Sequence, residues 1–429
     1  MIVGNAIEVP KEKTTLLSFG HEELKNNDRC RTYHLREDGH GFVAAAGEED
    51  IYMLPEGFTK VAAVPGRVLA YNPTLAQAKS MDKLQLYLKV PEPCHFFRYF
   101  SVTGQEELYC VTRDSVLYLF DHSTASYGIG KGGVVAALFR ERVFTGNGLR
   151  LYYSRALNGK SWDDERYGSG YILFQSDDGG DILGLHPYKD KLYLMRRRGI
   201  SVLRVLGDEL NFKAIHLPMK CGSLVEESSA LCGEYIAYLT NCGLYLFNGA
   251  TSVLAENSRF DEIDVTQEVK AVSFEGRYYA LVYHKSGGRA IYCYDPEWHE
   301  GYFIENGAAD IASGDDLYFT RDDGYIYRLT ERGASKGFTP HFTLEGVALS
   351  LGEESMLRSV LIDGEGEFSI TITSNRGSRT VKGSAGEALK LRSPLRGNGY
   401  KLKVSIEGEA QEARFIGLHL CLTEENNGN

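Results

Sequence analysis

The sequence predicts an all-β protein: a β-propeller of about seven blades, within a range of six to eight, followed by a C-terminal antiparallel β-sandwich. Three observations lead to this prediction. Short runs of β-forming residues alternate with Gly, Asp and Asn turns, without a helical period. A two-stranded unit recurs along the chain at the spacing of propeller blades. After residue 332 the repeat stops and the strands become longer.

The stretch from residue 138 to 206 shows the pattern most clearly. One hairpin is expected at 142–154, turning at Gly146-Asn147-Gly148, and a second at 191–205, turning near Arg198-Gly199. Glycine supplies the positive φ that a tight hairpin turn requires.

The second hairpin recurs along the chain. Its equivalents lie at Leu108, Val143, Leu192, Tyr235, Tyr278 and Leu317, which are 35 to 49 residues apart, and each is followed by a turn and a partner strand. An earlier hairpin is predicted from Phe42 to Leu54, which brings the number of candidate blades to seven. The interval from Phe42 to Leu108 is long, and we expect it to contain a helical insertion at Thr74–Lys83, where helix-forming residues gather.

A four-stranded blade is apolar on both faces and is stable only when neighbouring blades cover them. The blades must therefore close into a ring. We expect an N-terminal strand at Ile2–Val9 to complete the last blade. The predicted domains are a propeller at 1–332, a linker at 333–340, a sandwich at 341–423 and a flexible tail at 424–429. Sandwich strands are expected at 343–351, 357–362, 368–374, 378–382, 388–391, 400–406 and 414–422.

Composition and charge restrict the function. The chain has 429 residues, 27 of them Tyr, and a net charge of -11. Tyr favours strands. The negative charge argues against a general nucleic-acid binder, but it is compatible with a wall along which DNA slides. Residues 1–15 show no signal peptide, and no apolar run approaches the roughly 18 residues of a membrane helix. We therefore expect no membrane insertion.

Two segments resemble ligand loops without meeting their requirements. Gly128–Gly133 (GIGKGG) looks like a phosphate loop, but it lacks the Ser or Thr after Lys and no helix follows. Ser176–Asp181 (SDDGGD) is similar to a calcium loop and to the Asp-box of sialidase propellers, but it lacks the EF-hand spacing and the Asp-box Trp. We interpret the first as a flexible connection and the second as a turn between strands.

No cofactor, metal or catalytic site is predicted. The eight Cys form no C-x-x-C pair, the eleven His show no metal spacing, and neither G-x-S-x-G nor H-E-x-x-H occurs. Reduced, buried thiols are expected. We predict that the chain is not an enzyme, although a propeller glycosidase would need only two carboxylates facing the centre, a pairing that sequence does not reveal.

Arg196, Arg197 and Arg198 form the densest positive cluster. At a hairpin tip they are candidates for contact with a neighbouring subunit or with DNA, because an arginine fork pairs well with carboxylates and phosphates. The alternative interpretation is a solvated turn.

The segment RERVFTGNGLRLYYSRA, then WDD, then GYILFQSDDGGDILGLHPYKDKLYLMRRRGISVL resembles the propeller of tailed-phage virion proteins. The C-terminal GEFSITITSNRG and LKLRSPLRGNGYKLKV resemble the β-sandwich beside such propellers. The resemblance spans about residues 139–422. The proteins that it points to are of the nozzle, packaged-DNA-stabilisation and head-completion types.

That resemblance implies a structural virion protein, made in the host cytoplasm and located in the tail or at the head–tail junction. The implied assembly is a homo-oligomeric ring below the portal and adaptor, which closes the DNA channel, anchors tail fibres and lets genomic DNA pass. The alternative hypothesis is a carbohydrate-binding or glycoside-hydrolase-like propeller with an accessory sandwich, because Tyr-rich surfaces can stack on sugar rings.

Overall fold

The structure is a computed structural model of the whole chain. It describes residues 14–25, 30–45, 47–81, 87–90, 93–104, 106–120, 124–162, 168–176, 179–205, 212–219, 222–330, 339–348, 354–407 and 413–424. Nearly all of its regular elements are β-strands; one short α-helix, α1 (His21–Lys25), and a 3-10 turn at Phe260–Glu262 are present in this part of the chain.

The chain folds into two compact units. One comprises 48–301 and 305–329, and the other comprises 1–47, 302–304 and 330–429. The predicted propeller boundary of 1–332 was therefore wrong at its N-terminal end, because residues 14–44 pair with C-terminal strands. The predicted linker and tail lie mostly outside the described residues.

The first unit is a β-propeller. Within the described residues it has seven sets of four strands, the number predicted; six are separate four-stranded sheets, and β26 to β29 belong to a nine-stranded sheet. The predicted hairpins are the second and third strands of six blades, paired in register. The blades, in chain order, are β6 (Lys60–Val64), β7 (Arg67–Asn72), β8 (Gln77–Ser80), β9 (Tyr87–Lys89); β10 (Pro93–Phe100), β11 (Glu106–Thr112), β12 (Ser115–Phe120), β13 (Thr124–Lys131); β14 (Val135–Phe139), β15 (Arg142–Asn147), β16 (Arg150–Tyr153), β17 (Gly170–Leu173); β18 (Ile182–Tyr188), β19 (Lys191–Arg196), β20 (Gly199–Arg204), β21 (Lys213–Pro218); β22 (Ala230–Cys232), β23 (Tyr235–Thr240), β24 (Gly243–Phe247), β25 (Ser252–Leu254); β26 (Lys270–Phe274), β27 (Arg277–Tyr283), β28 (Arg289–Asp295), β29 (Glu300–Ile304); and β30 (Ala308–Ser313), β31 (Leu317–Arg321), β32 (Tyr325–Thr330), β5 (Gly47–Met53).

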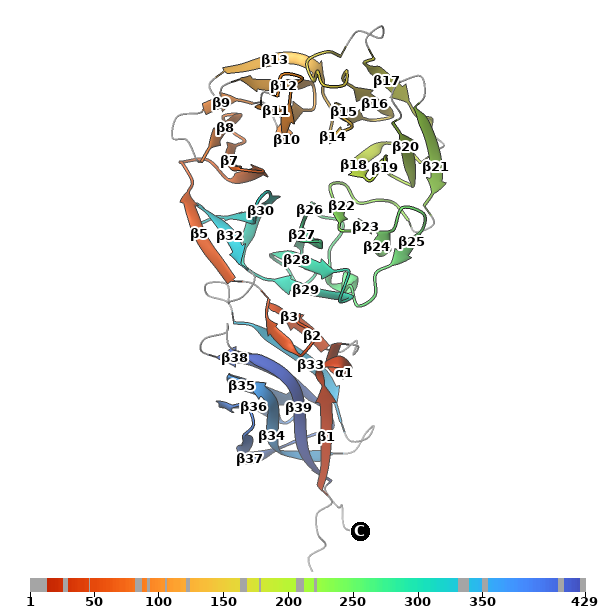
Figure 1. Cartoon of the computed structure of the whole chain (residues 1–429). Coiled ribbons are helices and arrows are strands. Elements are labelled where there is room, and N and C mark those ends of the chain that lie inside the picture. Colours follow the sequence, from red (N-terminus) through yellow and green to blue (C-terminus); the bar gives the residue numbers. More distant parts are fainter. Residues whose placement is uncertain are drawn as a thin grey trace, which may run out of the picture. The chain divides into compact units, whose positions relative to one another are not determined.

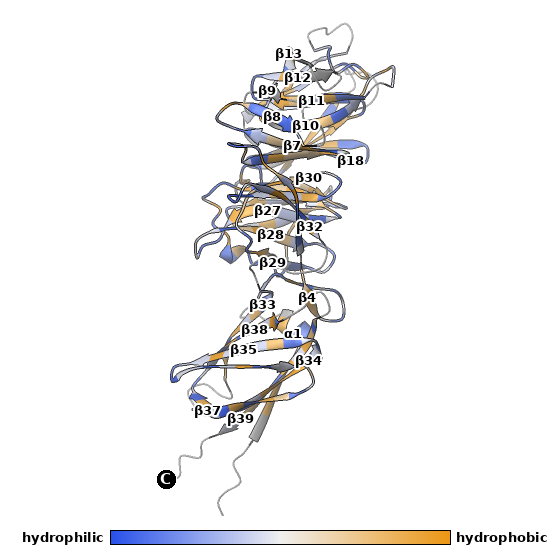
Figure 2. Cartoon of the chain, turned by 90° about the vertical axis from the view of Figure 1, so that its left-hand side faces the viewer, coloured by the Kyte–Doolittle hydropathy of each residue, from blue (hydrophilic) through white to orange (hydrophobic). Residues whose placement is uncertain are grey.

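The blades are arranged in a ring (Figure 1). The first strands of neighbouring blades contact one another around the centre, and fourth strands such as β13, β17, β21 and β25 lie at the outer rim. Figure 2 shows hydrophobic and hydrophilic residues intermixed along the strands seen from the side. Each pair of adjacent blades buries its facing apolar side chains; one such interface contains Phe144, Leu151, Leu185 and Leu194.

The ring closes through β5, which forms the fourth strand of the seventh blade beside β32. The predicted hairpin from Phe42 to Leu54 was wrong: β4 (Phe42–Ala44) pairs with β3 (Leu35–Glu37) and β39, whereas β5 belongs to the propeller. The segment Ile2–Val9, expected to close the ring, lies outside the described residues. An N-terminal strand therefore closes the ring, but at a later position than predicted.

The predicted helix at Thr74–Lys83 was also wrong. The segment contains the turn after β7 and the strand β8, which pairs with β7. The Asn72 Oδ1 atom accepts a hydrogen bond from the Leu75 N–H at 3.0 Å, and Ala76 has a φ of 51°, so the backbone leaves the helical region. Strand pairing within the blade overrides the helix propensity of Ala, Gln, Lys and Met.

Tyrosine hydroxyls link elements that are distant in the sequence. The fully buried Tyr278 donates from its hydroxyl to the Ser228 carbonyl of the preceding blade at 2.7 Å. Tyr99 donates to the Glu141 carbonyl of the following blade at 3.1 Å, and burial raises the pKa of Tyr99 to about 12. A large apolar ring that ends in a single polar group fills these interfaces without leaving the polar group unpaired.

The second unit is a β-sandwich. One sheet has the order β3-β4-β39-β34-β37 with β1 (Thr14–Gly20) also on β39, and the other contains β2-β33-β38-β35-β36. Seven strands match the seven predicted segments: β33 (His341–Val347), β34 (Ser355–Glu365), β35 (Glu367–Ser374), β36 (Gly377–Ser384), β37 (Ala388–Gly397), β38 (Tyr400–Glu407) and β39 (Arg414–Glu424). N-terminal strands, among them β2 (Cys30–Tyr33), complete the sheets, and Phe42, Phe342, Phe368 and Phe415 meet in the core.

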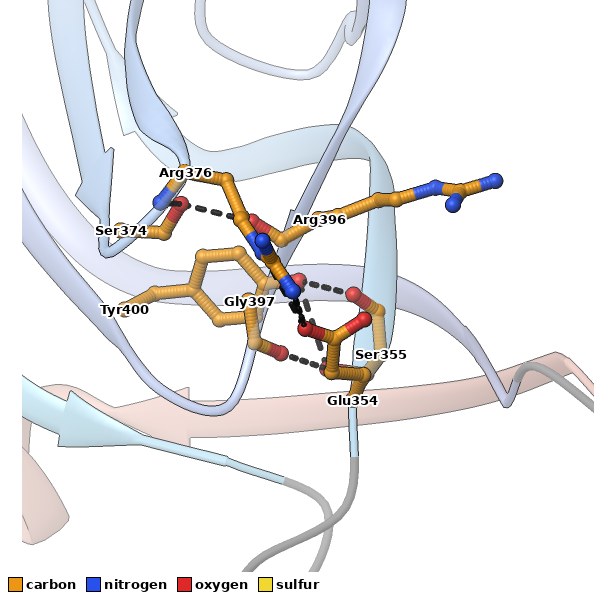
Figure 3. A network of polar contacts seen from close by, with 7 residues as sticks. All are labelled: Glu354, Ser355, Ser374, Arg376, Arg396, Gly397 and Tyr400. Carbon is orange, nitrogen blue, oxygen red and sulfur yellow. Dashed lines mark hydrogen bonds and ion pairs between the residues drawn. The ribbon is translucent and has the colours of Figure 1, made fainter. Parts of the chain in front are cut away.

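A polar network joins three loops of the sandwich (Figure 3). The buried Tyr400 hydroxyl lies 2.6 Å from the Ser355 carbonyl and 2.9 Å from the Leu395 carbonyl, and Ser374 donates to the Arg396 carbonyl at 2.6 Å. An ion pair between Arg376 and Glu354 lies beside them (Figure 3). The network holds the turns between strands and brings together no nucleophile and base, so we interpret it as structural.

The closing strand provides the first test. Glu48 of β5 forms an ion pair with Arg321 of β31, and its side chain is only 2% exposed. We expect Glu48→Gln to lower the free energy of unfolding by about 2–3 kcal/mol, because it leaves a guanidinium poorly compensated in a buried place. Chemical denaturation measures the change.

Glu56→Gln, at an exposed turn next to the same strand, is the matched control and should change stability by less than about 0.5 kcal/mol. Equal stability of the two variants would show that ring closure does not depend on the Glu48–Arg321 pair.

Candidate functional site

The three arginines predicted as a contact patch lie in three different environments. Arg196, the last residue of β19, is fully buried. It donates to the Gly180 and Gln175 carbonyls, both at 2.7 Å, and its guanidinium lies over the Phe174 ring. The prediction that Arg196 contacts a subunit or DNA was therefore wrong, because its donors are bonded to the Gln175 and Gly180 carbonyls inside the chain.

Arg197 and Arg198 lie at the turn that follows. Arg197 pairs with Glu226 at 2.9 Å and approaches Asp181 at 3.9 Å, so its charge is balanced within the chain. Arg198 is exposed, and no side-chain partner for it is found among the described residues. Of the three arginines, only Arg198 has the exposed side chain, unpaired among the described residues, that a contact residue needs. A contact made by Arg198 stays a prediction.

The two loop-like motifs have packing roles where they are described. Gly130 lies in β13, where a Cβ would overlap the Trp162 ring, and a Cβ on Gly132 would overlap the backbone at Ser115. These glycines allow close approach between chain segments, and the segment is not a flexible connection. Residues 177–178 of the acidic turn lie outside the described part; Gly179 and Gly180, which follow them, have positive φ values and form the turn into β18.

Polar side chains from six blades gather at the innermost strands, where Figure 1 places the centre of the ring. They come from the first strands β6, β10, β18, β26 and β30 and from the segment before β22. We call the following residues the axial cluster: Lys60, His95, His186, Glu227, Lys270 and Asp310.

Several members of the axial cluster connect neighbouring blades. Lys270 pairs with the buried Asp310 of the next blade at 2.7 Å, and Asp310 accepts the Val61 N–H of the blade after that at 2.8 Å. His186 Nε2 lies 2.8 Å from Ser229 Oγ of the following blade. These contacts fix the side chains in position and link first strands around the ring.

The surroundings change the protonation of the other members. Burial lowers the pKa of His95 to about 4. A hydrogen bond with the Val134 backbone acts in the opposite direction, and the charge of nearby Lys270 adds to the lowering. Burial and the nearby His95 lower the pKa of His186 to about 4. Both imidazoles are therefore neutral at pH 7.

The Glu227 side chain is exposed, but surrounding protein displaces bulk water. Desolvation raises the pKa of Glu227, partly offset by Lys270 and Lys60. Perturbed groups that converge on one place are typical of functional sites.

The axial cluster was not predicted, although the repeat contained a signal for it. Its members follow the blade period: 60, 95, 186, 227, 270 and 310 differ by 35, 91, 41, 43 and 40 residues, and the 91-residue step spans two blades. Residues that occupy equivalent places in successive blades meet around the axis. A search for polar residues at the blade period would have found them.

Metal ligands, cysteines and apolar helices give no further candidate site in the described residues. No group of three or more His, Cys, Asp or Glu side chains there could hold a metal ion. Cys30, Cys110, Cys232 and Cys293 are buried and form no disulfide within the described part of the chain, whereas Cys242 is exposed. No helix in the described ranges is both long and apolar enough to cross a membrane.

Comparisons with known proteins found distant structural likenesses. No family model and no curated protein matches the chain. Similar solved structures include virginiamycin B lyase from Staphylococcus aureus (10% identity, 74% of this chain and 99% of that chain, TM-score 0.42). Two others are the calcium-binding protein regucalcin from Agrobacterium tumefaciens (12%, 67% and 94%, 0.34) and the Pan2 WD40 domain of Neurospora crassa (8%, 69% and 97%, 0.38). All three are β-propellers, and their names share no activity.

The different roles of the arginines can be measured. Arg196→Ala removes a fully buried cation and leaves two carbonyls without donors, so we expect the free energy of unfolding to fall by about 3 kcal/mol. Arg198→Ala should change it by less than about 0.5 kcal/mol. Urea denaturation measures the free energy of unfolding of both variants. Similar losses of stability would contradict the conclusion that Arg196 is buried and Arg198 is not.

The two axial histidines predict an acid-sensitive propeller. Their folded-state pKa of about 4 lies below the unfolded value of 6.5, so the unfolded chain binds more protons between these limits. Stability should therefore fall as the pH falls through this window, by about 2 kcal/mol per histidine between about pH 7 and pH 5. Glu227, with its raised pKa, acts in the opposite direction.

Thermal unfolding across this pH range tests the expectation in wild type and in a His95→Gln, His186→Gln double variant. The variant should show a flatter pH dependence. An unchanged slope would mean that other groups carry the acid sensitivity.

Proposed function

We propose that this chain is a structural subunit of a tailed-phage virion, of the nozzle or head-completion type, which assembles with copies of itself through its blade rims. Two observations support the proposal. The first is the resemblance of residues 139–422 to the propeller and sandwich of such proteins. The second, which carries the proposal physically, is an exposed apolar rim on three consecutive blades.

The apolar rim lies on the fourth strands β17, β21 and β25. Five large apolar side chains there are between 51% and 61% exposed: Tyr171, Leu173, Ile215, Val253 and Leu254. In the described part of each blade, these strands end the sheet, so their outer backbone groups have no neighbouring strand. Exposed apolar residues on an open sheet edge favour association with another chain.

We propose that a second copy of this chain binds to the apolar rim. A contact between different edges of identical subunits repeats by rotation and closes into a ring. The edge strand β5, in the seventh blade, offers a different surface, with exposed Glu49, Asp50 and Met53. Asp50, together with Glu49, which already pairs with Arg328 of its own blade, complements Arg204 and Lys213, which are exposed and directly opposite each other on β20 and β21. The portal, the adaptor, tail fibres and passing genomic DNA are the further partners that the resemblance implies.

The axial cluster does not favour the alternative of a glycoside hydrolase. Such an enzyme needs an acid and a second carboxylate on either side of the scissile bond. Asp310 is committed to Lys270 and to the Val61 N–H, so it is poorly placed to act as nucleophile or base.

Assembly is tested with a Leu173→Asp, Leu254→Asp double variant. Two carboxylates in an apolar contact should weaken self-association by about tenfold or more, because their burial is unfavourable. Native mass spectrometry and light scattering at micromolar concentration measure the oligomer, with and without a portal–adaptor complex.

Val102→Asp is the matched control, since Val102 is 74% exposed at a turn away from the rim. The proposal requires the control to assemble like wild type. A wild-type chain that stays monomeric and never joins the portal–adaptor complex would refute it.

A further inference from the structure

The axial cluster contains polar groups that its inter-blade contacts leave unused. Lys270 and Asp310 are paired, and one nitrogen of each histidine is occupied by Ser229 or by the Val134 backbone. Within the described residues, the Lys60 ammonium, the Glu227 carboxyl and the second nitrogen of both imidazoles have no hydrogen-bond or ion-pair partner. Converging polar groups that are accessible to solvent and unpaired within the described part of the chain are available to a ligand.

We propose that Lys60, Glu227, His95 and His186 form a binding site at the propeller axis for a small hydroxylated carboxylate of the sugar-acid type. The Lys60 ammonium would bind the carboxylate, and the imidazole nitrogens and Glu227 would bind hydroxyl groups. The proposal is independent of assembly through the apolar rim, because no axial residue belongs to the rim strands.

The charges of the axial cluster favour a ligand that carries a single negative charge. Lys60 is the only cation of the cluster without an ion-pair partner among the described residues, because Lys270 is held by Asp310. A ligand with several negative charges would be repelled by Glu227 and Asp310. A metal ion would be repelled by the two lysines, and the cluster lacks a group of three ligands that could hold one.

The histidines provide the hydroxyl preference. A neutral imidazole has one donor and one acceptor nitrogen, and a hydroxyl group can satisfy either. Burial keeps both rings neutral at pH 7, as described above. Because Ser229 and Val134 fix the rings, little rotamer entropy is lost on binding.

The axial site also requires a glycine at one backbone position, Gly184. A Cβ on Gly184 would overlap the Ser229 hydroxyl and would lie 3.2 Å from His186 Nε2. Glycine at this position therefore allows the His186–Ser229 contact that orients the imidazole. Gly184→Ala is expected to disturb the site without changing any group that touches the ligand.

The test uses the full-length protein with D-glucuronate as the probe. D-glucose, which has hydroxyl groups but no carboxylate, and acetate, which has a carboxylate but no hydroxyl groups, are the comparison compounds. Calorimetry measures affinity, and the ring C–H signals of His95 and His186 report location by NMR. We expect saturable binding of glucuronate that shifts both histidine signals, with glucose and acetate weaker by about tenfold or more.

Variants separate the roles. Lys60→Met should reduce glucuronate binding to the level of glucose, and Lys60→Arg should retain it because the charge is kept. His186→Gln should weaken glucuronate and glucose together. Lys390→Met, at an exposed lysine of the sandwich, is the control and should bind like wild type. A thermal melt of each variant confirms folding.

Three results would overturn the proposal. One is no saturable glucuronate binding at millimolar concentration. Another is equal affinity for acetate and glucuronate, which would indicate an unspecific anion contact. The third is binding that persists unchanged in folded Lys60→Met.

Discussion

The structure depends on covering both faces of every blade. A four-stranded sheet with apolar residues on its two faces is unstable in water, and a row of such sheets always leaves two faces uncovered at its ends. Closing the row into a ring removes those ends. In this chain β5 completes the seventh blade beside β32, and the Glu48–Arg321 pair lies at that junction. Packing, the inter-blade hydrogen bonds and the meeting of polar residues at the axis all follow from the closed ring.

Ring closure also separates two kinds of surface in the propeller. First strands crowd around the centre, where each charged or polar side chain has neighbours from other blades; Asp310, for example, contacts both Lys270 and Val61. Fourth strands lie at the rim with one open edge, where Leu173 and Leu254 remain exposed. We propose that the interior binds a small polar ligand and that the rim takes part in protein association. The two proposals address these two surfaces separately.

Much of the fold could be predicted from local pattern. The spacing of Leu108, Val143, Leu192 and the later repeats predicted the second and third strands of six blades, because a hairpin is specified by nearby residues. The helix at Thr74–Lys83 failed because pairing of β8 with β7 outweighs weak helix propensity. The site was predicted poorly: Arg196 has the charge of a contact residue, but it is buried, where it lies over the Phe174 ring and donates to two carbonyls.

The sequence by itself determined the strand pattern, the blade period, the second and third strands of six blades and the strands of the C-terminal sandwich, since each depends on residues close together in the chain. Tertiary structure alone decided the rest. It divided the N-terminal strands, giving β5 to the propeller and β1 to β4 to the sandwich, and it brought Lys60 and His95 together with Lys270 and Asp310. Such choices depend on which surfaces remain uncovered after the local elements form, and distant residues decide that.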